Sequence, residues 1–96
     1  MSKIYYVYIL GSHKNGVLYT GITSNIHSRL YVHRYGPTSG FSSKYKTYKL
    51  FYLEEYEDVG EAIKREKNIK KWYRQWKINL INKNNPEWKD LADELM

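Results

Sequence analysis

Two runs of aromatic and β-branched residues flank Asn15-Gly16, and they constrain the fold of this chain more than any other feature. Residues 4–10 and 17–22 both have the composition of a β-strand. Asn and Gly both tolerate a positive φ, which a tight hairpin turn requires. The start of the chain, up to residue 22, therefore predicts a β-hairpin.

The sequence that follows the hairpin predicts a helix, an exposed loop and a third strand. Ser24 or Asn25 can cap a helix that ends near Tyr35, because Gly36-Pro37 cannot continue it. Residues 37–47 are polar and contain a glycine, so they predict an exposed loop. Residues 48–56 predict the third strand.

Two or three further helices are expected in the second half of the chain. Asp58 and Glu61 have the spacing of a capping box, which predicts a helix through residue 69, and the helical pattern continues to about residue 81 after a break near Tyr73. Asn85-Pro86 predicts a last short helix to Leu95. The order β-β-α-β-α-α predicts a small α/β (α+β) domain with a three-stranded sheet. We expect residues 1–82 to form the domain and residues 83–96 a helical extension packed on it.

Length and cysteine content exclude several classes of protein. A chain of 96 residues predicts one domain with a modest core. The chain has 0 cysteines, which excludes a disulfide scaffold and a thiolate zinc site. No apolar run approaches the roughly 20 residues of a membrane span, and no signal-peptide cleavage site is visible near the N-terminus. We expect a soluble cytoplasmic domain, by default monomeric.

Charge and aromatic content favour a nucleic-acid partner. The chain has 16 Lys or Arg against 10 Asp or Glu, a net charge of +6. Its 11 tyrosines and 3 tryptophans exceed what a small core can enclose. Exposed aromatic rings among cations can stack on unpaired bases, or they can be half-buried rings with a hydrated hydroxyl. The region of Trp72, Trp76 and Trp88 is either core packing of the late helices or an interaction surface, and helical projection makes Trp72 more exposed than Trp76.

Polar residues stand at or beside apolar helix faces. Arg29 and His33 lie one turn apart at the edge of the apolar stripe of the first helix. Glu66 projects to the middle of a stripe whose other members are Val59, Ala62, Ile63, Ile69 and Tyr73. A carboxylate there is costly unless it is paired or binds a metal. It either pairs with Arg29 in a structural salt bridge or serves a catalytic site.

Strand tyrosines complete a candidate site. Tyr6 and Tyr8 share one face of the first strand, Tyr19 lies on the second, and Gly21 leaves room there for close approach. Each tyrosine alone is compatible with ordinary sheet packing. Together with an Arg/His helix face and one carboxylate, they hold what phosphodiester hydrolysis requires: a group to place water, a cation for the phosphorane charge and an anionic ligand for Mg²⁺.

At these positions the chain resembles a GIY-YIG nuclease domain of the small stand-alone bacterial type grouped as UPF0213. Tyr6-Val7-Tyr8 stands where that family has GIY, and Tyr19-Thr20-Gly21 where it has YIG. Arg29 and His33 match the family's helix arginine and the histidine one turn later. The run 62–66 matches the segment that ends in the metal-binding glutamate, and the likeness covers residues 4–81.

The resemblance implies a three-stranded antiparallel sheet flanked by helices and a metal-dependent endonuclease acting on DNA. Glu66 would bind Mg²⁺ (or Mn²⁺), Tyr8 or Tyr19 would place the attacking water, Arg29 would stabilise the phosphorane and His33 would orient the site or share a proton. A phenol pKa near 10 would have to be lowered by the metal or Arg29 for Tyr8 to act as a base.

The sequence does not identify the nucleic-acid substrate or the lysines that contact it. Single-stranded, duplex or branched DNA, or RNA, all fit the pattern. Lys44, Lys46 and Lys70 are candidate nucleic-acid contacts, and Lys70 lies near the place where many family members carry Asn or Gln. The alternative function is a non-catalytic nucleic-acid-binding module on the same scaffold.

Overall fold

The computed structural model describes residues 3–35 and 49–95. Its strands are β1 (Tyr5–Gly11), β2 (Leu18–Thr23) and β3 (Lys49–Tyr56). Its helices are α1 (Ile26–Tyr35), α3 (Val59–Lys71), α4 (Arg74–Asn84) and α5 (Ala92–Leu95). None of the helices in these two ranges is long and apolar enough to cross a membrane.

The three strands form one antiparallel sheet in the order β2-β1-β3, as expected. Asn15 has a φ of 60° in the connection between β1 and β2, which confirms the turn predicted there. Tyr8 pairs with Gly21 across the hairpin and Leu10 pairs with Tyr19. This register fixes which β2 residues lie beside Tyr8.

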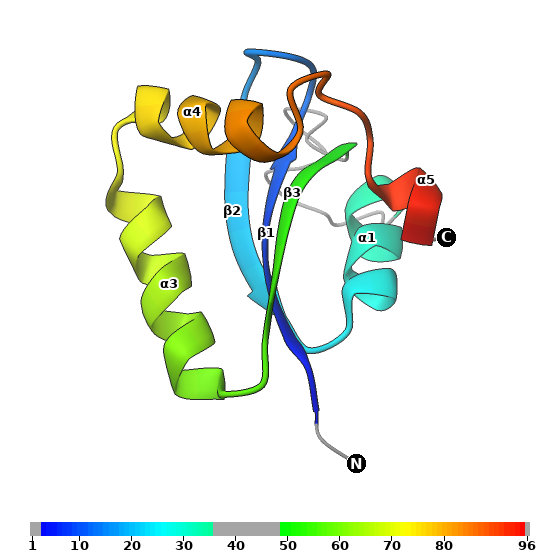
Figure 1. Cartoon of the computed structure of the whole chain (residues 1–96). Coiled ribbons are helices and arrows are strands. Elements are labelled where there is room, and N and C mark those ends of the chain that lie inside the picture. The colour runs from blue at the N-terminus through cyan, green and yellow to red at the C-terminus, as the bar shows by residue number, and fades with distance from the viewer. Residues whose placement is uncertain (1–2, 36–48, 96) are drawn as a thin grey trace.

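Helices cover both faces of the sheet (Figure 1). α3 and α4 pack on the face that carries Val7 and Ile9, and the core there includes Ile69, Ile81 and Trp88. α1 and α5 pack on the opposite face. That second core comprises Tyr8, Leu10, Ile26, Leu30, Leu50 and Ala92. Because side chains alternate along β1, Tyr8 belongs to the α1 side of the sheet.

The predicted cap of α3 is confirmed, and its buried stripe is narrower than expected. Asp58 Oδ1 accepts hydrogen bonds from the backbone N–H groups of Gly60 and Glu61. Ala62, Glu66 and Ile69 are buried. The other expected members of the stripe, Val59, Ile63 and Tyr73, are 44%, 40% and 74% exposed. Only the side chains nearest the sheet are therefore covered.

The prediction of a last helix from Asn85-Pro86 to Leu95 is wrong: only Ala92–Leu95 are helical there. Asn85 is buried, and its side-chain amide donates to the carbonyls of Phe51 and Lys89 and accepts from the Lys89 N–H instead of capping a helix. Trp88 has a φ of 54°, which interrupts helical geometry, and its ring packs against Phe51. This segment then reaches the start of β3, where Leu50 donates to Asp90 Oδ1 and accepts from the Leu91 N–H.

The expected order of exposure of the tryptophans is reversed. Trp76 is 53% exposed, Trp72 is only half-buried at the junction of α3 and α4, and Trp88 is buried. The reason is the break after Lys71, which changes the helical phase on which the projection depended.

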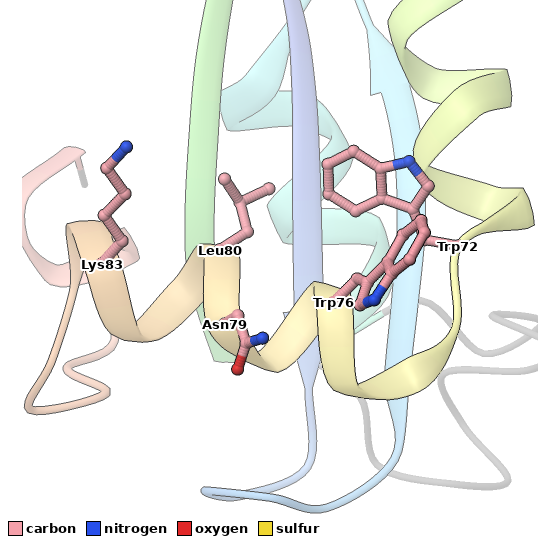
Figure 2. A pocket seen from close by; sticks show the side chains of 5 residues that line it. All are labelled: Trp72, Trp76, Asn79, Leu80 and Lys83. Atoms are coloured by element: carbon pink, nitrogen blue, oxygen red, sulfur yellow. The ribbon is translucent and has the colours of Figure 1, made fainter.

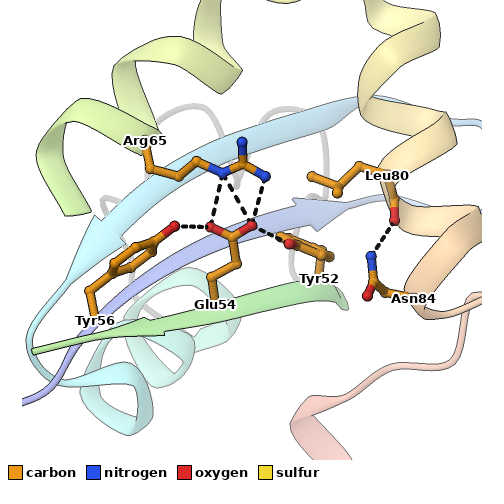
Figure 3. Close-up of polar contacts among 6 residues, drawn as sticks. All are labelled: Tyr52, Glu54, Tyr56, Arg65, Leu80 and Asn84. Carbon is orange, nitrogen blue, oxygen red and sulfur yellow. Dashed lines mark hydrogen bonds and ion pairs between the residues drawn. The ribbon is translucent and has the colours of Figure 1, made fainter. Parts of the chain in front are cut away.

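A polar cluster lies on the α3 side of β3 (Figure 3). Glu54 accepts hydrogen bonds from the hydroxyls of Tyr52 and Tyr56 and from the guanidinium of Arg65, which also forms an ion pair with it at 2.9 Å. The Arg65 guanidinium in turn lies 5.1 Å from the ring centroid of Trp72. Although burial opposes it, the bonds from Arg65 and the two tyrosines lower the pKa of Glu54, so the cluster ties α3 to β3 as a charged network.

Candidate active site

Three aromatic rings meet on the α1 side of the sheet. The ring centroid of Tyr19 lies 6.5 Å from that of Tyr8 and 5.3 Å from that of His33. The Tyr8 hydroxyl lies 3.4 Å from His33 Nε2. β1, β2 and α1 thus bring together three side chains that are distant in sequence.

Gly21 makes room for the Tyr8 ring. A Cβ atom at position 21 would lie 2.5 Å from Tyr8 Cζ and 2.8 Å from Cε2, closer than carbon atoms can approach. The close approach that was expected at Gly21 is thus made by the Tyr8 ring. The absence of a side chain at position 21 holds the phenol against β2 and directs its hydroxyl to His33.

Gly21→Ala is expected to displace Tyr8 and to lower the free energy of unfolding by about 1–3 kcal/mol, because overpacking in a closed core cannot relax freely. Thermal unfolding measures the loss. Gly60→Ala is the matched control: the nearest atom to its new Cβ is an Asp58 oxygen at 3.1 Å, and Ala favours a helix, so its unfolding midpoint should stay equal or rise. Equal midpoints for the two variants would contradict the close packing of Tyr8 on Gly21.

Arg29 is an exposed residue of α1 that acts electrostatically on the aromatic cluster. Its charge lowers the pKa of both Tyr8 and His33. A shallow depression of about 360 Å³ lies beside it, lined by Thr23, Ser24, Asn25, Ser28, Arg29 and Val32. Arg29 therefore lines a polar hollow open to solvent, and its charge acts on Tyr8 and His33.

Burial keeps Tyr8 and His33 uncharged. Desolvation, the largest effect, raises the pKa of Tyr8 well above its usual value, Tyr19 and Glu66 raise it further, and the opposing influence of Arg29 is smaller. Arg29 alone therefore does not lower the pKa of Tyr8 as far as a free base would require. Desolvation and Arg29 both lower the pKa of His33. A neutral phenol thus faces a neutral imidazole at pH 7.

His33 is expected to titrate below its ordinary value of about 6.5, and Arg29→Gln should raise its pKa. Because folding favours the neutral ring, the stability contributed by His33 is present above about pH 6.5 and is lost as the pH falls from there to the folded-state pKa. Nitrogen chemical shifts of the ring measured by NMR against pH test both statements. A midpoint above 6.5 would contradict the burial of this imidazole.

Glu66 is buried on α3, and its ion pair in the described ranges is with Lys70, not with Arg29. Lys70 Nζ lies 2.7 Å from Glu66 Oε2, one helical turn away. The side chain of Lys70 is half exposed, while that of Glu66 is 11% exposed. The expected structural salt bridge thus exists with a different partner, which leaves Arg29 outside it.

A lone carboxylate such as that of Glu66 suits only a hard divalent cation that keeps most of its waters. The described residues contain no group of three or more His, Cys, Asp or Glu that could enclose a metal. One carboxylate with substrate phosphate and water is a common arrangement for Mg²⁺. Glu66 would supply that carboxylate, which in this structure pairs with the Lys70 ammonium.

Of the three predicted nucleic-acid contacts, the structure describes only Lys70. Lys44 and Lys46, with the loop 37–47, lie outside the described residues. Lys70 lies beside Glu66. Sequence reasoning missed Arg74, whose guanidinium donates to the carbonyls of Asn15 and Gly16. A count of charged residues along the chain would have pointed to it, because Arg74 lies in the strongly positive segment 59–84.

A family model described as the GIY-YIG catalytic domain matches residues 4–79. A UPF0213 protein of Staphylococcus saprophyticus is 36% identical over 78 residues, which cover 81% of this chain and 94% of that protein. One from Staphylococcus haemolyticus is 35% identical over 77 residues, 80% of this chain and 93% of that protein.

The fold also has a solved counterpart. The solution NMR structure of a UPF0213 protein from Bacillus halodurans matches with a TM-score of 0.58 at 24% identity, and it covers 94% of this chain and 95% of that one. This likeness concerns the fold alone. On the family match and the sequence relatives, the chain belongs to the GIY-YIG catalytic domain family, whose members are generally nucleases, and to its UPF0213 group.

Proposed function

We propose that this protein is a divalent-metal-dependent endonuclease that hydrolyses phosphodiester bonds in DNA, with structure-selective or weak sequence preference. One observation carries the proposal: Tyr8, Tyr19 and His33 meet within 6.5 Å between ring centroids, and the charge of Arg29 acts on Tyr8 and His33. In a family of nucleases, this is the combination that hydrolysis of a phosphodiester needs.

Tyr8 and His33 would handle the proton of the attacking water. In the His33 tautomer that carries no proton on Nε2, the Tyr8 hydroxyl would donate to this nitrogen across the observed 3.4 Å and accept from the water. As the water oxygen bonds to phosphorus, its proton would pass to Tyr8 while the Tyr8 proton passes to His33. The opposite P–O ester bond would break, the leaving alkoxide would take a proton from solvent, and His33 would then release its extra proton to solvent. This relay needs no free phenolate, so it agrees with the raised pKa of Tyr8.

Arg29, and a metal held by Glu66, would stabilise the negative charge on the phosphate. The guanidinium of Arg29 is exposed and offers a planar fork of donors to the phosphate oxygens as negative charge builds up. Glu66 would hold Mg²⁺ or Mn²⁺, which when bound neutralises phosphate charge and assists the leaving oxygen. Tyr19, in ring contact with both partners of the relay, would hold them in place.

A cleavage assay with a matched pair of tyrosine variants tests the proposal. The purified protein is incubated with Mg²⁺ or Mn²⁺ and with single-stranded, duplex, flap and junction DNA, and with single-stranded RNA. We expect cleavage of at least one DNA, which Tyr8→Phe removes while Tyr6→Phe retains it; Tyr6 packs in the same core but lies outside the ring cluster. Binding without cleavage on every substrate would favour a non-catalytic nucleic-acid-binding module.

A further inference from the structure

The excess positive charge of the chain resides in one part of the fold. Residues 59–84, which span α3 and α4, contain eight Lys or Arg and two Glu. Their net charge of +6 therefore equals that of the whole chain, and the remaining residues sum to zero. A positive surface concentrated on two consecutive helices fits contact with a polyanion.

Three of these cations gather where α3 meets α4. Lys70, at the end of α3, pairs with Glu66 at 2.7 Å. Arg74, at the start of α4, donates two hydrogen bonds to carbonyls of the β1–β2 turn. Lys77 is half-buried one turn further along α4. Lys70 thus lies beside the candidate metal ligand, and Arg74 lies beside the turn that leads into β2.

Arg74 and Lys77 are three residues apart on α4, so they lie on the same side of the helix. Burial lowers the pKa of Lys77, and the charges of Arg74 and Lys70 lower it further. The hydrogen bonds of Arg74 go to neutral carbonyls, and within residues 3–35 and 49–95 the carboxylate that forms an ion pair with this cluster is that of Glu66. The cluster therefore retains positive charge that an anion would neutralise.

We propose that Lys70, Arg74 and Lys77 form a docking site for the phosphodiester backbone of the nucleic acid beside Glu66. The identity of this polyanion rests on the function proposed above. β2 is an edge strand with α1 on one face of the sheet and α3 on the other. Backbone phosphates bound at this cluster would flank the scissile phosphate, so the cluster would position the strand while Arg29 and the aromatic residues act on one bond.

A second feature of α4 supplies the matched control. Trp72, Trp76, Asn79, Leu80 and Lys83 line a groove of about 280 Å³ (Figure 2). Lys83 stands at the far end of this groove from Trp72 and belongs to the same helix as Lys77. The two lysines are about 120° apart around the helix axis, because successive residues turn by about 100°. Neutralising either one lowers the net charge by the same amount.

The experiment compares Lys77→Gln with Lys83→Gln in DNA binding. A fluorescein-labelled 20-base-pair duplex and its separate strands are titrated by anisotropy in EDTA, at salt concentrations from 50 to 200 mM. Binding by the parent should weaken steeply with salt. Lys77→Gln should raise Kd about fivefold or more and reduce the slope of log K against log salt by about one. Lys83→Gln should change Kd less than twofold, and Lys77→Arg should bind like the parent.

Equal losses in Lys77→Gln and Lys83→Gln would overturn the proposal, since affinity would then follow net charge alone, and so would a parent protein that does not bind DNA at 50 mM salt. Amine acetylation of the parent gives a readout without any variant: bound DNA should protect Lys77 and not Lys83. Because cleavage plays no part in these measurements, a protein that docks DNA here and never cuts it would sustain this inference while overturning the nuclease.

Discussion

Glu66→Gln is expected to lower metal-dependent cleavage about a thousandfold, because a metal that neutralises phosphate contributes several kcal/mol to the transition state. Glutamine keeps the size of the side chain but is a poor ligand for a hard cation. DNA binding should stay equal or tighten slightly, since a negative charge near phosphate is removed. The unfolding midpoint should change little, because Lys70 is half exposed and can be hydrated when its partner is gone.

Glu61→Gln is the control for that experiment. Glu61 lies in the first turn of the same helix and is exposed, so its substitution makes the same change in charge away from the candidate metal position. We expect it to cleave like the parent. If Glu66→Gln instead cleaves at the parental rate with Mg²⁺, Glu66 is not the metal ligand.

Arg29→Ala is expected to lower cleavage about a hundredfold with little change in DNA binding or in the unfolding midpoint. The reason is that Arg29 is exposed and forms no part of the Glu66 ion pair, so its removal strands no buried charge. Its contribution falls on charge that develops in the transition state, while ground-state binding is expected to rest on other cations, above all Lys70, Arg74 and Lys77. Cleavage rates, anisotropy and thermal unfolding measure the three quantities.

Arg65→Ala makes the same substitution at an arginine that forms an ion pair, and it should lower stability while cleavage is retained. Arg65 holds Glu54 in a half-buried network, so its loss leaves that carboxylate without a cation and should cost about 1–3 kcal/mol of stability, with cleavage retained. An Arg29 variant that unfolds as easily as the Arg65 variant would show that Arg29 is structural.

Local signals account for the parts of the fold that could be predicted. Asn15 supplies the positive φ that turns β1 into β2, and Asp58 caps α3 with its carboxylate, both as their sequence positions indicate. Asn85 carries a similar signal and fails, because its amide is buried against the Phe51 carbonyl. A capping residue predicts a helix only where the tertiary structure leaves its side chain free to cap.

The sequence also predicts some features of the candidate site and not others. Strand alternation places Tyr6 and Tyr8 on one face of β1, and a one-turn spacing places Arg29 and His33 on one face of α1. That Tyr8 and His33 meet is shown only by the structure. The protonation of Tyr8 does not follow from the sequence, because it depends on how completely the ring is enclosed over Gly21. The ion-pair partner of Glu66 does not follow from the sequence either. Lys70, four residues away on the same helix, and Arg29, on another helix, are both cations that could pair with it, and the structure shows Lys70.

The contact of Asp90 and Leu91 with Leu50 has a consequence for the behaviour of the protein in concentrated solution. An edge strand with free N–H and C=O groups is a template on which another chain can add a strand. At the start of β3 both outward-facing groups of Leu50 are already occupied, one by the Asp90 carboxylate and the other by the Leu91 N–H. The C-terminal segment thus blocks edge-to-edge association at this point, and a chain shortened before Asp90 would expose a surface prone to aggregation.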